Sequence, residues 1–285
     1  MTHAVTDTHQ TRLFSILSEM ESVLVCYSGG VDSALVLAAA HEVLGARAVG
    51  MTAVSPSLAP SEKELAASVA RRIGARHELV ESHEIDDPDY QRNGPDRCFH
   101  CKSELYDIST LKQKEWGIAH VVNGTNLDDL GDHRPGLEAA KRAGVRSVLV
   151  EAEFRKADVR RVAELMGLSV WDKPASACLS SRIPYGTSVT RERLAQIAGL
   201  EAELHALGLR QVRVRWHAVN ASTDAAPSMA RIEVEKGELA RAFDARDAIA
   251  AAGRRFGFNY VTLDLEGYRM GSHNEVLARR SLRVV

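Results

Sequence analysis

Six consecutive residues near the start of the chain combine groups that could bind an anion: Ser28, Gly29, Gly30, Val31, Asp32 and Ser33. The two glycines allow successive backbone N–H groups to point toward one ligand, and the serine hydroxyls can donate to the same ligand. An apolar run precedes the segment and an Ala- and Leu-rich run follows it, which predicts a strand and then a helix. The helix N-terminus would add partial positive charge. The segment therefore predicts a phosphate-binding loop, with a glycine turn and serine helix cap as the alternative.

The same six residues differ from the G-x-x-x-x-G-K-[ST] loop because no lysine follows the glycines. That lysine holds the β- and γ-phosphates of a nucleotide. A loop whose donors are N–H and hydroxyl groups suits a pyrophosphate that leaves during the reaction.

Three cysteines could take part in chemistry. Cys98 and Cys101 stand three residues apart at the start of a predicted helix, where two thiols can bind one metal ion. This spacing alone is a weak signal that also fits a redox pair, half a zinc site, part of an iron–sulfur site, or two unrelated cysteines. Cys178 precedes Arg182 by four positions, and a thiol near a cation favours a nucleophile, although a buried structural cysteine is the alternative. Cys26 falls inside the first predicted strand and is assigned to the core.

Polar residues also follow two other predicted strands. The backbone from Met51 to Ser55, at the end of the strand 48–54, is expected to contact adenine, because open α/β sheets bind ligands at the carboxyl ends of their strands. Gly124 opens a loop of small and polar residues that suits backbone contact with a nucleotide. Asp32 and three aspartates of that loop could bind Mg²⁺ or substrate: Asp128, Asp129 and Asp132. The alternatives are an ordinary connecting loop and a solvated acidic loop.

The elements that must position these residues alternate along the first part of the chain. Strands are predicted at 23–27, 48–54, 76–80, 120–122 and 147–150, each followed by a helix. This order predicts an α/β fold with an open, mostly parallel sheet covered by helices on both faces. An irregular stretch, 171–190, ends the pattern. We therefore expect one domain at 1–175, which carries the phosphate-binding loop, and a smaller domain at 176–285.

The second domain is predicted to be α+β, with helices at 191–207 and 238–254 and strands at 212–216, 230–234 and 260–265. Arg213 and Arg215 share one face of a strand, as do Glu233 and Glu235. These charged residues could pair with each other, or the arginines could bind a phosphate of the substrate. The sequence does not separate these two possibilities.

Composition limits the class of protein. The chain has 285 residues, a hydrophobic content of 45%, and 36 basic against 38 acidic residues, for a net charge of −2. This balance argues against a nucleic-acid-binding protein. The sequence contains neither an apolar signal core at its start nor a run of roughly 18 apolar residues that could span a membrane. We therefore expect a cytoplasmic protein with no membrane partner, whose cysteines are thiols or metal ligands.

Four motifs together resemble a known family: SGGVDS, GTNLDDLGDHRPG, SACLSSRIPYG and VTLDLEGYRMGS. The first resembles the signature of the PP-loop ATP pyrophosphatases. All four are similar to the LarE-type sulfur transferases of nickel-pincer nucleotide cofactor synthesis, over about residues 14–274. The resemblance implies that ATP adenylates a carboxylate of pyridinium-3,5-biscarboxylic acid mononucleotide, with release of pyrophosphate. Sulfur then displaces AMP to give a thiocarboxylate, and two rounds give the bisthiocarboxylate.

The resemblance implies two possible sources of sulfur. In some members the cysteine that matches Cys178 gives up its own sulfur and becomes dehydroalanine. In others that cysteine and two more hold a [4Fe–4S] cluster, whose open iron carries the transferred sulfide. The presence of Cys98 and Cys101 favours the cluster version here. The resemblance also implies that Ser181 and Arg182 orient substrate near Cys178, and that the chain forms a homo-oligomer, with hexamers known in the family.

Three other functions are considered. A tRNA thiolase would share the first motif but predicts a basic surface. An ammonia-using adenylating enzyme would make the cysteines a structural zinc site. A nucleotide-binding sensor would bind the nucleotide and release no pyrophosphate.

Overall fold

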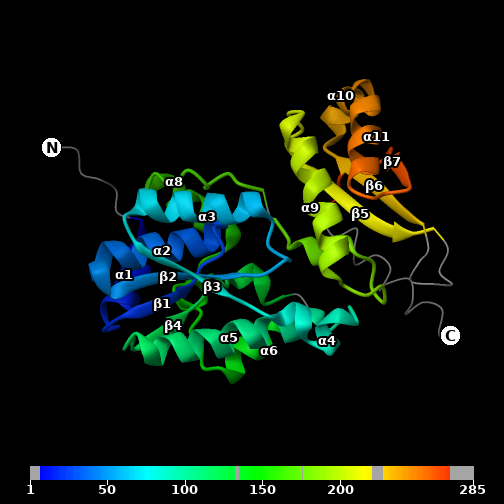
Figure 1. Cartoon of the computed structure of the whole chain (residues 1–285). Coiled ribbons are helices and arrows are strands. Elements are labelled where there is room, and N and C mark those ends of the chain that lie inside the picture. Colours follow the sequence, from blue (N-terminus) through cyan, green and yellow to red (C-terminus); the bar gives the residue numbers. More distant parts are fainter. Residues whose placement is uncertain (1–6, 132–134, 175, 220–226, 270–285) are drawn as a thin grey trace, which may run out of the picture. The chain divides into compact units, whose positions relative to one another are not determined.

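The computed structural model describes residues 7–131, 135–174, 176–219 and 227–269. The chain divides into two compact units (Figure 1). The first comprises Met1–Tyr90 and Pro95–Ser176, and the second comprises Gln91–Gly94 and Ala177–Val285. The short segment Gln91–Gly94 belongs to the second unit although it precedes most of that unit by more than 80 residues, which the sequence did not indicate.

A four-stranded parallel sheet of order β3-β2-β1-β4 forms the centre of the first unit. The strands are β1 (Val23–Cys26), β2 (Ala48–Val54), β3 (Arg76–Glu81) and β4 (His120–Val122). The chain moves outward from β1 to β3 and then returns to the free side of β1. The strand order therefore reverses between β1 and β4, and in open α/β sheets ligands bind beyond the carboxyl ends of the strands at such a point.

Helices cover both faces of this sheet, as Figure 1 shows. Because successive side chains of a strand point to opposite faces, Val23 and Val25 pack under one group of helices and Leu24 under the other. The first group contains α1 (Thr8–Ser18), α2 (Val31–Leu44), α3 (Pro60–Ile73) and α8 (Lys156–Leu165). The second contains α5 (Arg97–Glu115) and α6 (Pro135–Arg142). This arrangement confirms the predicted α/β class.

The prediction of a fifth strand at 147–150 is wrong. This segment forms the short helix α7 (Val148–Glu151), whose first two residues are fully buried in the core. Only an isolated bridge between Val122 and Arg146 marks the sheet edge there. A short apolar run cannot distinguish a buried strand from a buried helical turn by periodicity, so the sequence misled at this point.

The remaining elements of the first unit are short. The stretch 81–97 contains η2 (Glu84–Asp86) and α4 (Pro88–Gln91). The 3₁₀ turns η1 (Gly45–Arg47) and η3 (Leu127–Asp129) precede β2 and follow β4 respectively. No helix within the described ranges has both the length and the apolar character needed to cross a membrane.

A three-stranded mixed sheet of order β5-β6-β7 organises the second unit. β5 (Val212–Ala218) pairs antiparallel with β6 (Ser228–Val234), which pairs parallel with β7 (Tyr260–Leu263). The helix α9 (Arg191–Ala206) packs on β5 and α11 (Arg246–Arg255) packs on β7. The turn η4 (Leu179–Arg182) begins directly after Cys178.

The predicted single helix at 238–254 is interrupted. It consists of η5 (Lys236–Glu238), α10 (Leu239–Asp244) and α11, with Ala245 (φ −87°, ψ 10°) between the two α-helices. No glycine or proline lies at this break. Because the segment is rich in alanine, its sequence predicts a continuous helix.

Candidate active site

The segment Ser28–Ser33 joins β1 to α2 at the reversal of strand order. Gly29 has a left-handed backbone conformation (φ +74°). Gly30 is the N-cap of α2, and since it has no side chain it cannot cap the helix with a side-chain hydrogen bond. The hydroxyl oxygens of Ser28 and Ser33 lie 3.1 Å apart, and the Ser33 hydroxyl donates to the Gly30 carbonyl at 3.2 Å. The first N–H groups of α2 therefore face the loop without a side-chain cap, which favours an anion site over the serine-cap alternative.

Two neighbouring segments approach this loop so closely that a side chain would not fit. A Cβ atom on Gly29 would lie 2.8 Å from the Cβ of Ala66 on α3. A Cβ on Gly124, after β4, would lie 2.8 Å from the backbone nitrogen of Ser33. The segment after β4 thus packs directly against the first turn of α2, whereas contact of Gly124 with a nucleotide stays a prediction.

A lysine reaches the loop from a distant part of the chain. The Lys156 ammonium, at the start of α8, donates to one carboxylate oxygen of Asp32, and the Asn126 amide donates to the other at 3.0 Å. Lys156 follows Asp32 by 124 positions, so no local motif could have identified it. The loop itself contains no lysine, but the fold places one beside it.

Asp128 and Asp129 have local partners. The backbone N–H of Lys156 donates to Asp128 at 2.8 Å and the Arg155 guanidinium donates at 3.0 Å, and these contacts lower the pKa of Asp128. Asp129 accepts from the backbone N–H of Asn126 at 3.1 Å in a capping box. Asp132, the other aspartate considered for Mg²⁺, lies outside the described residues, as does the motif end 270–272.

The segment predicted to contact adenine lies at the carboxyl end of β2. The Met51 side chain is fully buried, and its carbonyl accepts from the Tyr27 N–H at 2.8 Å. Ser55 donates to the buried carboxylate of Glu84, which also accepts from Ser57 at 2.9 Å. Glu84 therefore fixes the loop after β2, and contact with adenine stays a prediction.

Cys98 and Cys101 occupy the start of α5 and form no disulfide; Cys98 is exposed and Cys101 is half-buried. Cys26 lies 3.4 Å from the Ser109 hydroxyl and packs against the core between β1 and α5. Burial raises the pKa of the Cys26 thiol, which fits its assignment to the core. Cys178, the third predicted ligand, is exposed and belongs to the other unit.

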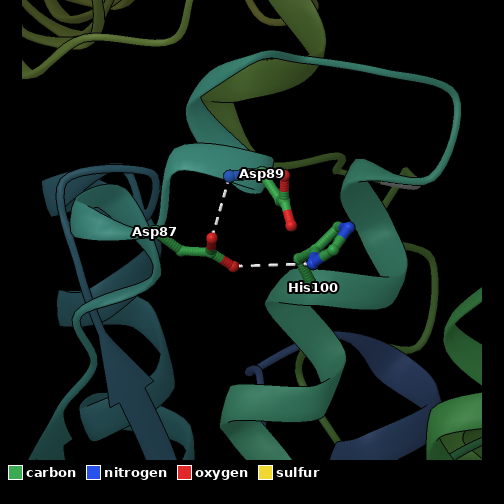
Figure 2. Close-up of side chains that lie close together, drawn as sticks. All are labelled: Asp87, Asp89 and His100. Carbon is green, nitrogen blue, oxygen red and sulfur yellow. Dashed lines mark hydrogen bonds and ion pairs between the residues drawn. The ribbon is translucent and has the colours of Figure 1, made fainter.

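His100, between the two cysteines of α5, turns toward two aspartates near α4 (Figure 2). Its Nδ1 lies 3.5 Å from a carboxylate oxygen of Asp87, and one ligand atom each from Asp87, Asp89 and His100 fall within 4.8 Å of one another. The other Asp87 oxygen accepts from the Asp89 N–H at 2.8 Å, as in a helix cap. These contacts fit a structural role for the three side chains, which connect the region of α4 to α5.

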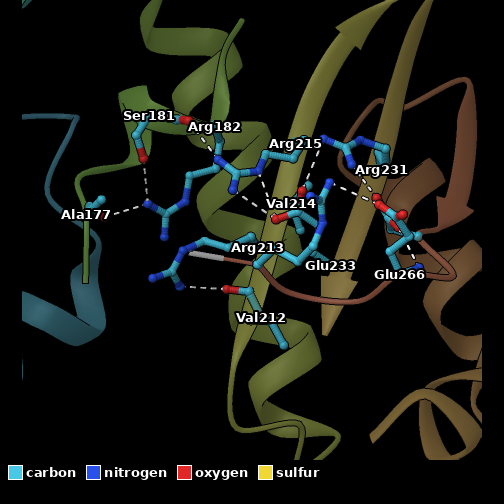
Figure 3. Close-up of polar contacts among 12 residues, drawn as sticks. Ala177, Ser181, Arg182, Val212, Arg213, Val214, Arg215, Arg231, Glu233 and Glu266 are labelled. Atoms are coloured by element: carbon cyan, nitrogen blue, oxygen red, sulfur yellow. Dashed lines mark hydrogen bonds and ion pairs between the residues drawn. The ribbon is translucent and has the colours of Figure 1, made fainter. Parts of the chain in front are cut away.

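In the second unit, the Arg182 guanidinium turns toward the Ser181 hydroxyl and the Ala177 carbonyl (Figure 3). The Ser181 hydroxyl donates to the Cys178 carbonyl at 2.8 Å, and Arg182, which is 3% exposed, donates to the same carbonyl at 2.9 Å. The predicted role of these residues in orienting substrate is not tested by these contacts.

Arg213 and Arg215 are both buried but have different neighbours. Arg215 forms an ion pair with Glu233 at 2.9 Å and donates to the Ser181 carbonyl at 3.0 Å. Arg213 donates to the Val212 carbonyl at 2.8 Å and stacks on Tyr268. Burial, and then the neighbouring Arg182, lower the pKa of Arg213. The pairing alternative therefore holds for Arg215 with Glu233, whereas phosphate binding stays a prediction.

These features define an α/β protein with a glycine loop at a reversal of strand order and a separate unit that carries an exposed cysteine. No protein-family model matches the chain. It is 36% identical over 276 residues, 96% of this chain and 97% of the relative, to the pyridinium-3,5-bisthiocarboxylic acid mononucleotide synthase of Lactiplantibacillus plantarum. It is 45% identical over 270 residues, 94% of this chain and 97% of the relative, to an uncharacterized protein of Synechocystis.

An uncharacterized protein of Methanocaldococcus jannaschii is 25% identical over 87% of the chain and 91% of its own length. The identity to the synthase extends over nearly the whole of both proteins. The chain therefore belongs to the LarE-type sulfur transferases, a family of enzymes.

Proposed function

We propose that this enzyme uses ATP to activate the carboxylates of pyridinium-3,5-biscarboxylic acid mononucleotide and converts them to thiocarboxylates. The observation that carries the proposal is the similarity, over 96% of the chain, to a relative named as the synthase of the bisthiocarboxylic acid mononucleotide. The position of the Ser28–Ser33 loop at the reversal of strand order supports a nucleotide site in the first unit.

The activation step forms a bond between a carboxylate oxygen and the α-phosphorus of ATP. The bond from that phosphorus to the β-phosphate breaks, and pyrophosphate leaves with the electron pair. The N–H groups at the start of α2 and the hydroxyls of Ser28 and Ser33 would stabilise the charge on the leaving group. Lys156 would add a full positive charge beside the loop.

The metal expected with the nucleotide is Mg²⁺, which would neutralise phosphate charge when bound. Asp32 is the ligand we assign to it, because this carboxylate belongs to the loop itself and its side chain is 25% exposed. Oxygen donors of this kind fit Mg²⁺. Asp128 is the weaker candidate because it lies outside the Ser28–Ser33 loop and pairs with the Arg155 guanidinium.

The transfer step requires a sulfur nucleophile that attacks the acyl carbon, with AMP as the leaving group. Cys98, Cys101 and Cys178 would hold a [4Fe–4S] cluster, because thiolates are its usual ligands and two of the three cysteines lie in the first turns of α5. Such a cluster, when bound, would supply sulfide from an iron that lacks a protein ligand.

The second candidate mechanism is favoured by the exposed Cys178 thiol. Here the Cys178 thiolate would attack the acyl adenylate to form a thioester and release AMP. Loss of the Cα proton and cleavage of the Cβ–S bond would leave the thiocarboxylate and dehydroalanine. Each chain would then act once.

The central test incubates the anaerobically purified enzyme with ATP, Mg²⁺ and the pyridinium dicarboxylate. We expect AMP, pyrophosphate and a product that carries sulfur by mass spectrometry, whereas formation of ADP and phosphate would contradict the proposal. Iron and acid-labile sulfide analysis of the same sample tests the cluster. A loss of about 34 Da at Cys178 in the spent protein, the mass of H₂S, would identify the sacrificial mechanism. Sedimentation of the purified enzyme tests the predicted homo-oligomer.

A further inference from the structure

The main chain of Cys178 is held by an unusual number of donors. Its carbonyl accepts from the Ser181 N–H at 3.0 Å, from the Ser181 hydroxyl at 2.8 Å and from the Arg182 guanidinium at 2.9 Å. Arg182 also donates to the Ala177 carbonyl through the same nitrogen. The turn is therefore fixed through its main chain, while the Cys178 residue itself is exposed.

The guanidinium that holds this turn is itself held by Glu201 of α9. Arg182 Nε donates to Glu201 Oε1 at 3.0 Å and Nη2 donates to Oε2 at 3.3 Å, with the two side chains 3% and 8% exposed. A two-point contact of this kind sets the orientation of the guanidinium as well as its position. Because the pair is buried, loss of one partner would leave the other charge poorly solvated.

Glu201 also bonds the strand that carries the two arginines. Its Oε1 accepts from the backbone N–H of Val214 at 2.9 Å. β5 is an edge strand among the described residues, so no described strand lies on this side of the sheet to accept from the N–H. Val214 lies between Arg213 and Arg215, and the Glu201 carboxylate thus joins the Cys178 turn to β5, in addition to the bond from Arg215 to the Ser181 carbonyl.

We propose that Glu201 is a positioning residue that, through Arg182, sets the place of the Cys178 turn relative to Arg213 and Arg215. The functional part of this inference rests on the proposed role of Cys178 in sulfur transfer. Glu201 contacts neither substrate nor sulfur in this scheme. It determines the alignment of the sulfur with a substrate whose phosphate the arginines would bind.

Two substitutions separate the two contacts of Glu201. Glu201→Gln keeps one oxygen, which can still accept from the Val214 N–H. The second oxygen becomes an amide N–H₂, a donor that cannot accept from the Arg182 guanidinium. Arg182→Lys keeps the positive charge but cannot make the two-point contact. The matched control is Glu203→Gln, because Glu203 lies two positions further along α9 and pairs with Arg255 at the surface, where the side chains are 42% and 58% exposed.

The experiment measures amide hydrogen exchange together with alkylation of Cys178 by iodoacetamide, with Cys98 as the internal reference. In Glu201→Gln and Arg182→Lys we expect exchange of the Ser181 amide to be roughly 10-fold faster. We expect Val214 to exchange at the wild-type rate in Glu201→Gln, and the alkylation rate of Cys178 relative to Cys98 to change at least about 3-fold. Glu203→Gln should match wild type in every measurement.

Wild-type exchange and alkylation in both variants would overturn the inference, as would equal effects in Glu203→Gln. If Glu201→Gln does not fold, as judged by circular dichroism, Arg182→Lys decides the question alone. Product formation is recorded separately. A wild-type enzyme that forms no thiocarboxylate contradicts the proposed function, while the exchange and alkylation data still decide whether Glu201 positions the turn.

Discussion

Gly29→Ala should destabilise the first unit because two independent features of the structure require glycine at this position. The backbone has φ +74°, and a Cβ would lie 2.8 Å from the Ala66 Cβ and 2.9 Å from the Ala66 Cα. A left-handed conformation costs an L-residue roughly 1–2 kcal/mol. Overpacking against backbone costs about 1–3 kcal/mol more. The two terms predict a loss of about 2–5 kcal/mol in the free energy of unfolding.

Gly30→Ala is the matched control in the same loop. Gly30 has φ −77°, and its Cβ would meet only the Ser28 hydroxyl, at the ordinary contact distance of 3.5 Å. Replacing an N-cap glycine with alanine costs roughly 1 kcal/mol or less. The two variants therefore add the same methyl group to adjacent residues and differ in backbone conformation and available space.

Urea unfolding followed by tryptophan fluorescence measures the difference. Trp116 and Trp171 belong to the first unit, so the signal reports mainly on the part of the chain that contains the loop. Surface substitutions usually change the free energy of unfolding by no more than about 0.5 kcal/mol. If the free energy of unfolding of Gly29→Ala lies within that range of wild type, the argument from space and backbone strain is wrong. Equal losses in the two variants would refute it in the same way.

Three further predictions concern charge and sulfur. Lys156→Met should weaken ATP binding several-fold, because it removes a positive charge beside the proposed phosphate site; equilibrium binding of ATP measures this, and unchanged affinity contradicts it. Cys178→Ala should abolish product, whereas single-turnover assays of Cys98→Ala should show loss of activity with a cluster and one turnover with a sacrificial cysteine. Burial and two neighbouring arginines lower the pKa of His217 to about 4, from 6.5 in an unfolded chain. Because the unfolded chain binds the proton first, stability should fall as the pH drops from 6.5 toward 4, and His217→Gln should reduce this slope in urea unfolding.

Much of the first unit follows from local sequence patterns. The strands β1 and β2 and the glycine loop between them were predictable because apolar runs are bounded there by turn residues. The segment at 147–150 was not, since four apolar residues fit a buried helical turn as well as a strand. The break at Ala245 also escaped prediction because helix propensity favours continuing through it.

The contacts within the site were less predictable than the elements that carry it. Lys156 meets Asp32 only because α8 begins near the carboxyl ends of β1 and β4, and this proximity depends on the order of the strands. Glu201 carries no motif signal, since an acidic residue on an amphipathic helix ordinarily faces solvent. Its burial depends on Arg182, whose own position depends on the turn after Cys178.

Arg213 and Arg215 share one strand face in the sequence pattern, but they have different partners in the structure. Arg215 is held by Glu233 and by the Ser181 carbonyl, so a phosphate would have to compete with a buried ion pair. Arg213 lies close enough to Arg182 for their like charges to lower its pKa, and an arriving phosphate dianion would relieve that repulsion. If the arginines bind the mononucleotide phosphate, Arg213 should therefore provide most of the affinity, and Arg215 should act mainly by keeping β5 joined to the Cys178 turn.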